Sequence, residues 1–477
     1  MSIQRMHAVA WVLACVLYGS GAAAVDGDYD TGWIPGGREI FPQVAGYDAR
    51  LRDMAVQGDA KVVLAGDCDV PQAESLCMAR LRADGALDLS FGPNQTGRFT
   101  FEDFPSYPPF GTLGSHGLAI QPDGRLVMAG FGEFNGANNM TVIVGTLARL
   151  SPDGATLELD GSSSYTPIYF SDDEDDLGNW VEGIALQPDG KIVLAGAANR
   201  AGSDPTNRDF GIMRLNADRS ADSSFGTNGV RLLAFDQGGN NDDYGEAVAL
   251  QPDGKIVVVG YATVTTGAGT AKNVAVARLN ADGSFDNAFG NAGRLWFPGY
   301  VFSTAQDAIG YAVKIDSRGR IVIAGTAQFS GADHDFLVAR LLPDGTLDPD
   351  FDADGIAIVA FDEADPKTDA AYDLVLAGDG TILLVGSASR SSTADSFAAA
   401  RVFENGSVDT TFGTFGRRVG TFAPGSGFTD VGTAAAAGPG GIYVAGRGAS
   451  GTGSGMMDFG IARLVIDHIF DGDFDPL

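Results

Sequence analysis

The hydrophobic and polar positions of this chain predict short β-strands joined by tight turns, with no sustained 3.6-residue apolar stripe that would indicate a helix. The stretch KIVVVGY is β-branched and apolar on both alternating sets of positions, so it predicts a strand that is covered on both faces. Pro252-Asp253-Gly254 before it is typical of a tight turn, because proline presets φ and glycine accepts a positive φ. This part of the chain predicts four strands, over residues 230–235, 247–251, 255–261 and 273–280.

The same pattern occurs seven times, with 60 to 66 residues between copies. Each copy has a glycine at the end of its KIVVVG-like run, namely Gly66, Gly130, Gly196, Gly260, Gly325, Gly386 and Gly446. An arginine follows in each copy at Arg80, Arg149, Arg214, Arg278, Arg340, Arg401 and Arg463. Two landmarks that stay in register indicate a repeat protein, whose units bury their apolar faces against each other.

Four antiparallel strands per unit, covered on both faces, predict an all-β, seven-bladed β-propeller. A linear stack of small sheets is the competing architecture, but its two ends would expose apolar faces. Residues 37–41 are similar to the first strands of later units, and no such strand follows Arg463. Counted from Arg38, the chain holds seven complete four-strand sets. If the blade boundary lies elsewhere, this N-terminal strand must complete the last blade and close the ring.

The repeated residues resemble those of the delta-60 repeat family, a β-propeller repeat of bacterial exported and surface proteins. The resemblance lies in Q-P-D-G-K-I-V-x-x-G followed by A-R-L-N-x-D-G-S-x-D-x-x-F-G, and it covers about residues 34–464. Copies three and four match best, and the last copy has Gly438-Pro439-Gly440-Gly441 in place of the Pro-Asp-Gly turn. The resemblance implies a propeller but no established activity.

Residues 1–24 are typical of a signal peptide: Arg5 is basic, residues 8–18 are apolar, and Ala22 to Ala24 form a small-residue cleavage site. A lipoprotein site at Cys15 and an uncleaved anchor are the other readings. We therefore expect an exported protein, in the periplasm, at the cell surface or outside the cell, with the propeller over residues 25–466. No other segment is apolar and long enough to span a bilayer. Residues 467–477 form a C-terminal tail, similar to one on some Gram-negative exported proteins, or an ordinary frayed terminus.

The net charge of −30 disfavours binding to nucleic acid or anionic lipid, and it suits either solubility outside the cell or attraction of cationic partners. Cys68 and Cys77 flank one short loop in the first repeat. In an exported protein such a pair predicts a local disulfide, with two buried free thiols as the alternative.

The residues that recur in every unit are expected to be structural. Each repeated arginine lies on the last strand of its unit, and in five units an aspartate follows, at Asp88, Asp222, Asp286, Asp348 and Asp409. We expect Arg–carboxylate pairs that fix the last turn of each blade. The phenylalanine of each Phe-Gly turn is expected to anchor the blade edge, with a carbohydrate platform as its alternative role: Phe91, Phe225, Phe289, Phe412 and, before Asp352, Phe351.

Acidic side chains gather in the loop between the first two strand signals of several units, at Asp172–Asp176, at Asp236, Asp242 and Asp243, and at Asp362, Glu363 and Asp365. They are expected on one face of the ring. Asp350, Asp352 and Asp354 also present the alternating carboxylates that begin a calcium loop, although Phe361 stands where the distal glutamate would be. Calcium is therefore a candidate ligand, and solvated acidic loops are the alternative.

Catalytic motifs are lacking. After residue 24 the histidines are His116, His334 and His468, in unrelated positions, and the chain has no His/Cys metal spacing, G-x-S-x-G elbow or phosphate loop. The expected function is non-catalytic recognition of a protein or a glycan at the bacterial surface or outside the cell. The alternatives are a hydrolase or lyase that cleaves extracellular polysaccharide with loop carboxylates, and a purely structural module.

Overall fold

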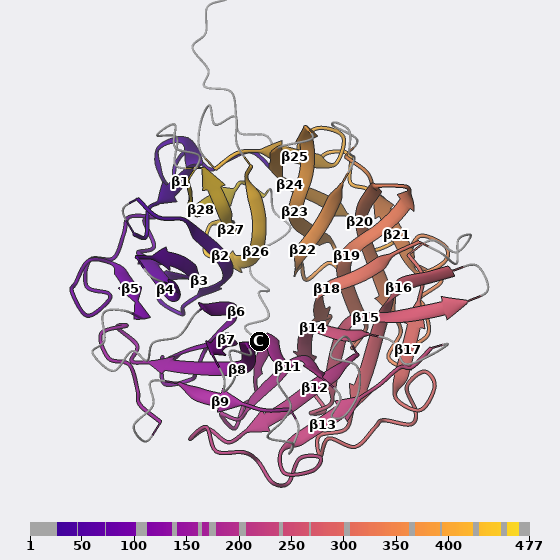
Figure 1. The fold of residues 1–477 in the computed structure, drawn as a ribbon. Coiled ribbons are helices and arrows are strands. Elements are labelled where there is room, and N and C mark those ends of the chain that lie inside the picture. The colour runs from indigo at the N-terminus through magenta and orange to yellow at the C-terminus, as the bar shows by residue number, and fades with distance from the viewer. Residues whose placement is uncertain are drawn as a thin grey trace, which may run out of the picture.

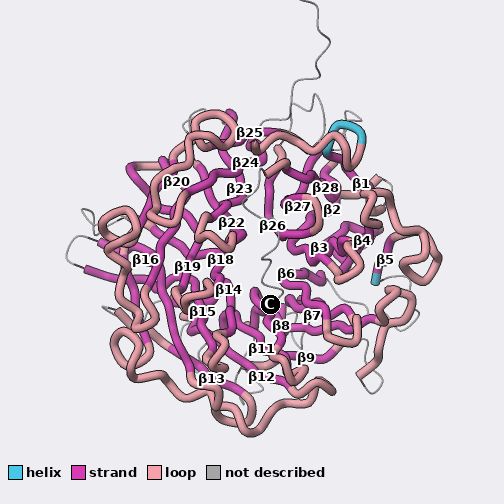
Figure 2. Tube along the Cα trace, turned by 180° about the vertical axis from the view of Figure 1, so that it is seen from behind, coloured by secondary structure: helices cyan, strands magenta, loops and turns pink. Residues whose placement is uncertain are grey.

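Seven small β-sheets form a closed ring around one axis in the computed structural model (Figure 1). The structure describes residues 26–44, 46–71, 73–101, 112–135, 141–160, 165–170, 178–199, 207–237, 242–266, 269–299, 306–361, 368–391, 394–422, 429–449 and 456–466. Within these ranges helical structure is limited to the 3₁₀ turn η1 (Pro35–Gly37) beside β1 and to Phe101 directly after β5, both cyan in Figure 2. The described part of the chain holds no helix long and apolar enough to cross a membrane.

The strands of the first four blades follow each other along the chain. Blade 1 holds β2 (Ala49–Val56), β3 (Val62–Val70), β4 (Ala73–Leu81) and β5 (Arg98–Thr100). Blade 2 holds β6 (Thr112–Ile120), β7 (Leu126–Asn135), β8 (Thr141–Leu150) and β9 (Thr166–Ile168). Blade 3 holds β10 (Asn179–Leu186), β11 (Ile192–Asn199), β12 (Arg208–Leu215) and β13 (Val230–Leu233). Blade 4 holds β14 (Asp243–Leu250), β15 (Ile256–Thr266), β16 (Gly269–Leu279) and β17 (Arg294–Phe297).

The remaining blades continue the series, except that the last takes one strand from the other end of the chain. Blade 5 holds β18 (Ala308–Ile315), β19 (Ile321–Ser330), β20 (Asp333–Leu341) and β21 (Ile356–Val359). Blade 6 holds β22 (Asp369–Leu376), β23 (Ile382–Ser391), β24 (Ala394–Val402) and β25 (Arg417–Gly420). Blade 7 holds β26 (Val431–Gly438), β27 (Gly441–Ala449), β28 (Met457–Leu464) and β1 (Arg38–Phe41).

The N-terminal strand closes the ring. β1 pairs antiparallel with β28, with Arg38 opposite Ala462 and Phe41 opposite Phe459, so the first strand of the chain is the outer strand of the last blade (Figure 1). The blade boundary therefore does not start at Arg38. Each four-strand set that begins at an outer strand is split between two blades, and the predicted alternative, in which the N-terminal strand completes blade 7, is correct.

Hydrophobic cores lie between the blades. The described residues form seven buried clusters, and each cluster joins two neighbouring blades, including the pair of blades 7 and 1. The second strand of each blade is the most deeply covered, as the burial of nearly every residue of β11 and β27 shows. A stack with free ends would leave two of these faces open, whereas the ring covers them all.

Three of the predicted strands of the fourth unit are too short. The glycine Gly260 does not end its strand, because β15 continues to Thr266, and β14 begins at Asp243 rather than at residue 247. β16 also begins earlier, at Gly269, than the predicted residue 273. The added residues include Tyr244 and Glu246, whose polar atoms disguise a strand in a reading based on apolar runs.

Candidate functional site at the propeller axis

Each inner strand carries one β-bulge at the same position. The register of the first strand against the second skips one residue in every blade, so that this residue has no partner across the ladder. The seven skipped residues are Arg52, His116, Glu182, Glu246, Tyr311, Tyr372 and Thr433, which we call the axial ring. Bulges re-aim side chains and occur often beside functional sites.

The repeated glycine is the counterpart of the bulge. Gly260 lies opposite Gly245 beside the bulge, and a Cβ atom on Gly260 would lie 1.9 Å from the carbonyl oxygen of Tyr244. In the other six blades the corresponding distance is 1.8 to 2.0 Å. No side chain fits at this separation, so the bulge requires glycine in every copy. The landmark glycine of the sequence thus marks the place where the inner strand bends toward the axis.

The axial ring reaches solvent from the centre of the molecule. Each inner strand contacts the inner strands of both neighbouring blades, and together the seven strands form a closed circle around the axis (Figure 1). All seven members of the axial ring are half-buried, although the strands behind them are buried. Side chains that differ from blade to blade therefore gather around one axis.

One residue from each of blades 2, 3 and 4 contributes to a hydrogen-bonded chain; two of the three belong to the axial ring. Nδ1 of His116 contacts the carboxylate of Glu182, and the hydroxyl of Tyr244 donates to the other oxygen of that carboxylate. Burial, and then the guanidinium of Arg52, lower the pKa of His116 to about 3. A neutral imidazole that donates Nδ1–H to Glu182 keeps Nε2 unprotonated, which is how a carboxylate orients a histidine that accepts protons.

A carboxylate follows the bulged residue in blades 1 and 6, which lie on either side of blade 7. Asp53 accepts hydrogen bonds from the backbone N–H of Leu118 at 2.7 Å and of Met54 at 2.7 Å, and Asp373 accepts equivalent bonds in blades 6 and 7. Burial, and then the charge of Asp373, raise the pKa of Asp53 to about 7, whereas Lys314 opposes this shift. Asp53 and Asp373 thus tie neighbouring inner strands together, and their charges act on each other.

Glu246 differs from Glu182 in having no hydrogen-bonded or ion-paired partner among the described residues. Within the described residues its carboxylate accepts no hydrogen bond and forms no ion pair, and burial raises its pKa to about 7 against the charge of Lys272. Beside it, Tyr244 stacks on Tyr261 with ring centroids 5.8 Å apart, and the guanidinium of Arg208 lies 4.5 Å from the ring centroid of Trp180. Aromatic faces and charged groups therefore meet between blades 3 and 4.

The repeated arginines lie away from this ring, in the scaffold. In five blades Nε of the arginine donates to Oδ2 of the aspartate eight residues later, at 2.7 to 2.9 Å. In blade 2 the acceptor of Arg149 is Glu158, at 2.7 Å. In blade 7 Arg463 donates to Asp30, at 2.9 Å, so its carboxylate comes from the N-terminal segment.

The arginines of blades 1 to 5 also donate to a backbone carbonyl of the next blade. Nη1 of Arg80 donates to the carbonyl of Pro152 at 2.6 Å, and its guanidinium lies 4.7 Å from the ring centroid of Phe91. The same contacts recur for the arginines and phenylalanines of blades 3, 4 and 5. The ring of Phe91 packs on Gly154 in the turn of the next blade. The phenylalanines Phe91, Phe225, Phe289, Phe351 and Phe412 are fully buried, so they offer no surface to a carbohydrate.

The N-terminal segment supplies more than a strand. Gly27 N donates to Val465 O at 2.7 Å, and Val465 N donates to Asp28 O at 2.8 Å. In the intact turn of blade 4, Gly283 N donates to Asn280 O and Asn280 N donates to Ser284 O in the same way. Trp33 takes the place of the buried phenylalanine, with the guanidinium of Arg463 at 5.3 Å from its ring centroid. Residues 26–41 are therefore the displaced end of the seventh repeat, and blade 7 is assembled from both ends of the domain.

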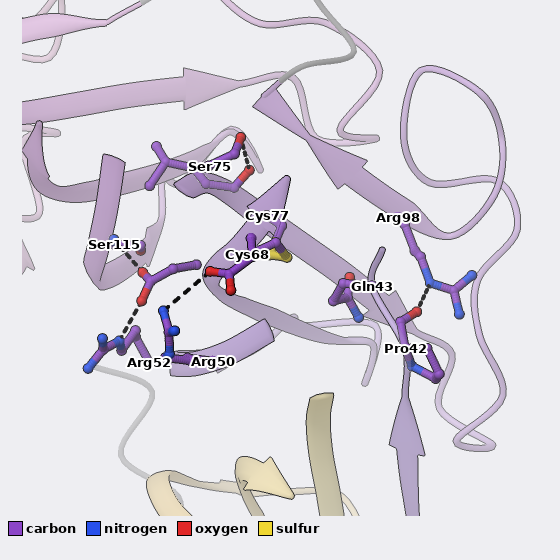
Figure 3. The surroundings of a disulfide bond; sticks show 12 residues. Pro42, Gln43, Arg50, Arg52, Cys68, Ser75, Cys77, Arg98 and Ser115 are labelled. Atoms are coloured by element: carbon purple, nitrogen blue, oxygen red, sulfur yellow. Dashed lines mark hydrogen bonds and ion pairs between the residues drawn. A yellow bond between two sulfur atoms is a disulfide. The ribbon is translucent and has the colours of Figure 1, made fainter. Parts of the chain in front are cut away.

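Cys68 and Cys77 are joined by a disulfide between β3 and β4 (Figure 3). Both residues are fully buried in the core between blades 7 and 1. Figure 3 also shows Arg52 near this bond, hydrogen-bonded to Asp67, whose other oxygen accepts the backbone N–H of Ser115 in blade 2. The bond stiffens the strand pair that leads to the axial ring in blade 1.

Asp350, Asp352 and Asp354 lie in the turn between β20 and β21, at the outer edge of blade 5. Asp352 has a φ of 46° where other units have glycine, and burial followed by the charge of Asp354 raises its pKa. Asp354 accepts the N–H of Ile356 at 3.0 Å. No group of three or more His, Cys, Asp or Glu within the described ranges is arranged to hold a metal ion. Calcium binding stays a prediction.

Only one acidic loop falls partly within the described residues. Asp243 accepts the N–H of Phe235 at 2.6 Å, and Asp242 accepts hydrogen bonds from Arg208 and Tyr261, so both hold the scaffold near the axis. Asp172–Asp176 and the group of Asp362, Glu363 and Asp365 lie outside the described residues, as do residues 1–24 with Cys15, and the tail 467–477.

The axial ring was missed in the sequence. Its members lie 14 residues before the landmark glycine in six units and 13 residues before it in the seventh, a signal hidden because the seven copies carry five different residue types there. His116 in particular was assigned no partner, because Glu182 is 66 residues away in the next unit. The turn formed by Asp26 to Asp30 could have been recognised, since it matches Asp282 to Asp286 in spacing.

The ring of seven four-stranded blades and its repeated motif define a β-propeller repeat protein. Five segments match the sequence model of a family described as a domain of unknown function (DUF5122) β-propeller, over residues 57–91, 187–225, 251–289, 319–351 and 377–412. No curated protein shows a significant match to the chain.

Solved structures with a similar fold are distant in sequence. A protein of unknown function from Dyadobacter fermentans DSM 18053 is 11% identical, with 90% of this chain and 98% of that chain covered and a TM-score of 0.46. The polysaccharide lyase Uly1 is 9% identical, with coverage of 88% and 91% and a TM-score of 0.42. A gluconolactonase from Xanthomonas campestris is 15% identical, with coverage of 78% and 96% and a TM-score of 0.34. Likenesses this weak carry no inference about activity.

Proposed function

We propose that this chain is an exported, non-catalytic recognition protein of the delta-60 repeat type, and that it binds a glycan at the axial ring. One observation carries the proposal: the residues that repeat are buried in the scaffold, whereas the bulges bring one polar side chain from each blade, of five residue types in all, to the axis. A rigid frame with variable polar groups at one place is typical of a binding site.

The chemistry of the axial ring suits a glycan. Tyr311 and Tyr372 bring hydroxyls and ring faces, with their centroids 5.2 Å apart, and Glu182, Glu246 and Thr433 bring hydrogen-bonding groups. Sugars combine hydroxyls that pair with carboxylates and hydroxyls, and apolar faces that pack on aromatic rings. Export is supported by the signal-peptide pattern of residues 1–24 and by the disulfide, since such bonds persist in oxidising compartments.

The test is a glycan array with the chain from residue 25 onward, followed by titration of each hit. Tyr311→Ala is expected to weaken binding at least about fivefold, because loss of one aromatic contact in a site costs roughly 1–3 kcal/mol. Phe415→Ala is the matched control, since Phe415 is 73% exposed at a hairpin tip far from the axis. Binding to proteins but to no glycan, or equal loss in both variants, would contradict the proposal.

A second candidate function is cleavage of an extracellular polysaccharide at the same ring. The observation that favours it is the contact of His116 with Glu182, which orients a neutral imidazole toward a bound sugar hydroxyl, although its lowered pKa makes this imidazole a weak base. Hydrolysis would release reducing ends, and elimination would release unsaturated products that absorb ultraviolet light. Turnover by the wild type that disappears in His116→Ala, with glycan binding retained, would favour this candidate over pure recognition.

A further inference from the structure

Positive charge gathers on one side of the axial ring, although the chain as a whole carries a net charge of −30. Arg50 and Arg52 lie on β2 in blade 1, and Arg447 lies on β27 in blade 7, directly after the landmark glycine Gly446. β2 and β27 pack against each other, and the charges of Arg50 and Arg52 both act on Arg447. Three guanidinium groups therefore share one sector of the axis.

These three arginines differ in how far they are neutralised. Arg50 is paired with Glu74 and lies 3.6 Å from Asp69. Arg52 uses only Nε, which donates to Asp67 at 2.9 Å, and its side chain is 37% exposed. Within the described residues, the two terminal nitrogens of Arg52 have no hydrogen-bond partner. Arg52 thus presents one edge of its guanidinium to the axis.

Arg447 is the least satisfied of the three. Its Nε is buried without a hydrogen-bond partner in the described part of the chain, and no ion pair with Arg447 is formed there. Burial, and then the charge of Arg52, lower its pKa, and only Tyr372 and Asp395 oppose these effects. A half-buried cation without a partner costs free energy in the empty protein, and an anion placed beside it would recover that cost.

The uncharged and acidic groups around these arginines indicate that the bound anion is part of a sugar. Tyr372 of the neighbouring blade interacts electrostatically with Arg447, and on the other side of Arg52 come His116 and Glu182. One sector of the axial ring is therefore cationic, while the rest offers hydroxyl, imidazole and carboxylate groups that suit sugar hydroxyls. A free inorganic anion would use the first sector only.

We propose that Arg52 and Arg447 form a subsite for the anionic group, a carboxylate or a sulfate ester, of an acidic glycan bound at the axial ring. This inference rests on the proposed function and names the class of its ligand. Arginine suits such groups because its planar fork donates two parallel hydrogen bonds to one anion. Arg52 presents a free edge, and Arg447 supplies a second, uncompensated charge.

Binding is measured by calorimetry with four probes: an oligogalacturonate, a chondroitin sulfate oligosaccharide, and an uncharged counterpart of each. Arg447→Gln is expected to weaken the binding of an acidic probe by about tenfold or more, since a charge-assisted hydrogen bond is worth about 1.5–3 kcal/mol. The double variant with Arg52→Gln should lose more, and added salt should weaken the wild type. The two acidic probes separate carboxylate from sulfate recognition.

Arg50→Gln is the matched control, because Arg50 is already paired with Glu74 and is expected to bind the acidic probes as the wild type does. In the absence of ligand, Arg447→Gln should melt at the same or a higher temperature, whereas loss of a merely structural arginine would lower the melting temperature. Equal affinity for acidic and uncharged probes, or unchanged affinity in Arg447→Gln, overturns the subsite and leaves the proposed function intact. Failure of all four probes in the wild type and of every glycan on the array would overturn both.

Discussion

Removal of residues 26–41 is expected to unfold the whole propeller rather than one blade. The deletion takes away β1 and the side chains of Trp33, Ile34 and Phe41, which are only 5–7% exposed in the core between blades 7 and 1. Burial of a large apolar side chain stabilises by about 1.5–3 kcal/mol, so these three contribute roughly 5–9 kcal/mol. A domain of this kind is stable by about 5–15 kcal/mol in total. The loss is therefore comparable with the whole stability.

The deletion also leaves Arg463 without its carboxylate, because Asp30 is its partner. A permuted chain supplies the control. In the intact fourth repeat, Asn280 and Ala281 directly precede the turn that begins at Asp282. Val465 and Ile466 are their equivalents in the seventh repeat, and Asp26 is the equivalent of Asp282. Residues 26–41 joined directly after Ile466 should therefore restore an unbroken seventh repeat. This permutant, starting at Gly46, is expected to regain most of the stability of the original chain, since the same contacts form.

The assay is urea unfolding followed by circular dichroism, together with calorimetric melting. The wild type and the permutant should show one cooperative transition at similar denaturant concentration, and the deletion variant should be unfolded or melt far lower. A deletion variant that melts like the intact protein would refute the closure argument. A permutant as unstable as the deletion would show that the two ends do not form one turn.

Four further predictions concern single positions. Arg278→Leu should lower the free energy of unfolding by about 3–5 kcal/mol, because Asp286 would be left as a buried charge, and the double variant with Asp286→Leu should recover much of the loss; unchanged melting of Arg278→Leu would contradict the pairing role. Gly260→Ala should cost about 3 kcal/mol in urea unfolding, since the new Cβ would lie 1.9 Å from a carbonyl oxygen, and a neutral effect would argue against the bulge. Burial raises the pKa of Glu246 from 4.5 to about 7, so the folded state binds the proton more tightly and the free energy of unfolding should fall as pH rises from 4.5 to 7. The urea midpoint of Glu246→Gln should depend less on pH over this range than that of the wild type. The same pH dependence of the midpoint in both proteins would refute the assignment. Millimolar calcium should raise the Tm and a chelator should lower it, with both effects lost in Asp352→Asn; the absence of any shift in the wild type would remove calcium as a ligand.

The fold could be predicted from the sequence because seven copies of one pattern are improbable by chance. Seven copies of one strand–turn pattern specify seven identical sheets, and the buried faces between them require a ring. Strand ends were harder to predict, since the start of β14 reads Asp-Tyr-Gly-Glu and its polar atoms conceal pairing that the structure shows. The position of the blade boundary stayed open between two alternatives, because it depends on which strand pairs with β28 and not on any local preference.

The candidate site was not predictable by the same means. A site formed by one residue from each blade has no local motif, and His116 and Glu182 meet only because blades 2 and 3 are neighbours in space. In the sequence Arg447 has no feature that distinguishes it from an ordinary surface cation. Only the packing of β27 against β2 places it near Arg52. Short catalytic and metal-binding motifs place their residues on one loop, whereas a propeller distributes such residues over the whole chain.

The bulge and its glycine separate the structural role of each blade from its chemical role. Because the glycine accommodates the displaced carbonyl by backbone geometry alone, the bulged residue itself is free to vary, and it does so from Arg52 to Thr433. The residue after the glycine varies in the same way, from Asp67 to Arg447, and lies beside it. The residue after the glycine is buried in five blades, so only the bulged position of each blade can change without disturbing the Arg–carboxylate pairs or the cores, which lie elsewhere in the sheets. Substitutions at the bulged positions should alter binding with little change in stability, whereas substitutions at the repeated arginines should do the reverse.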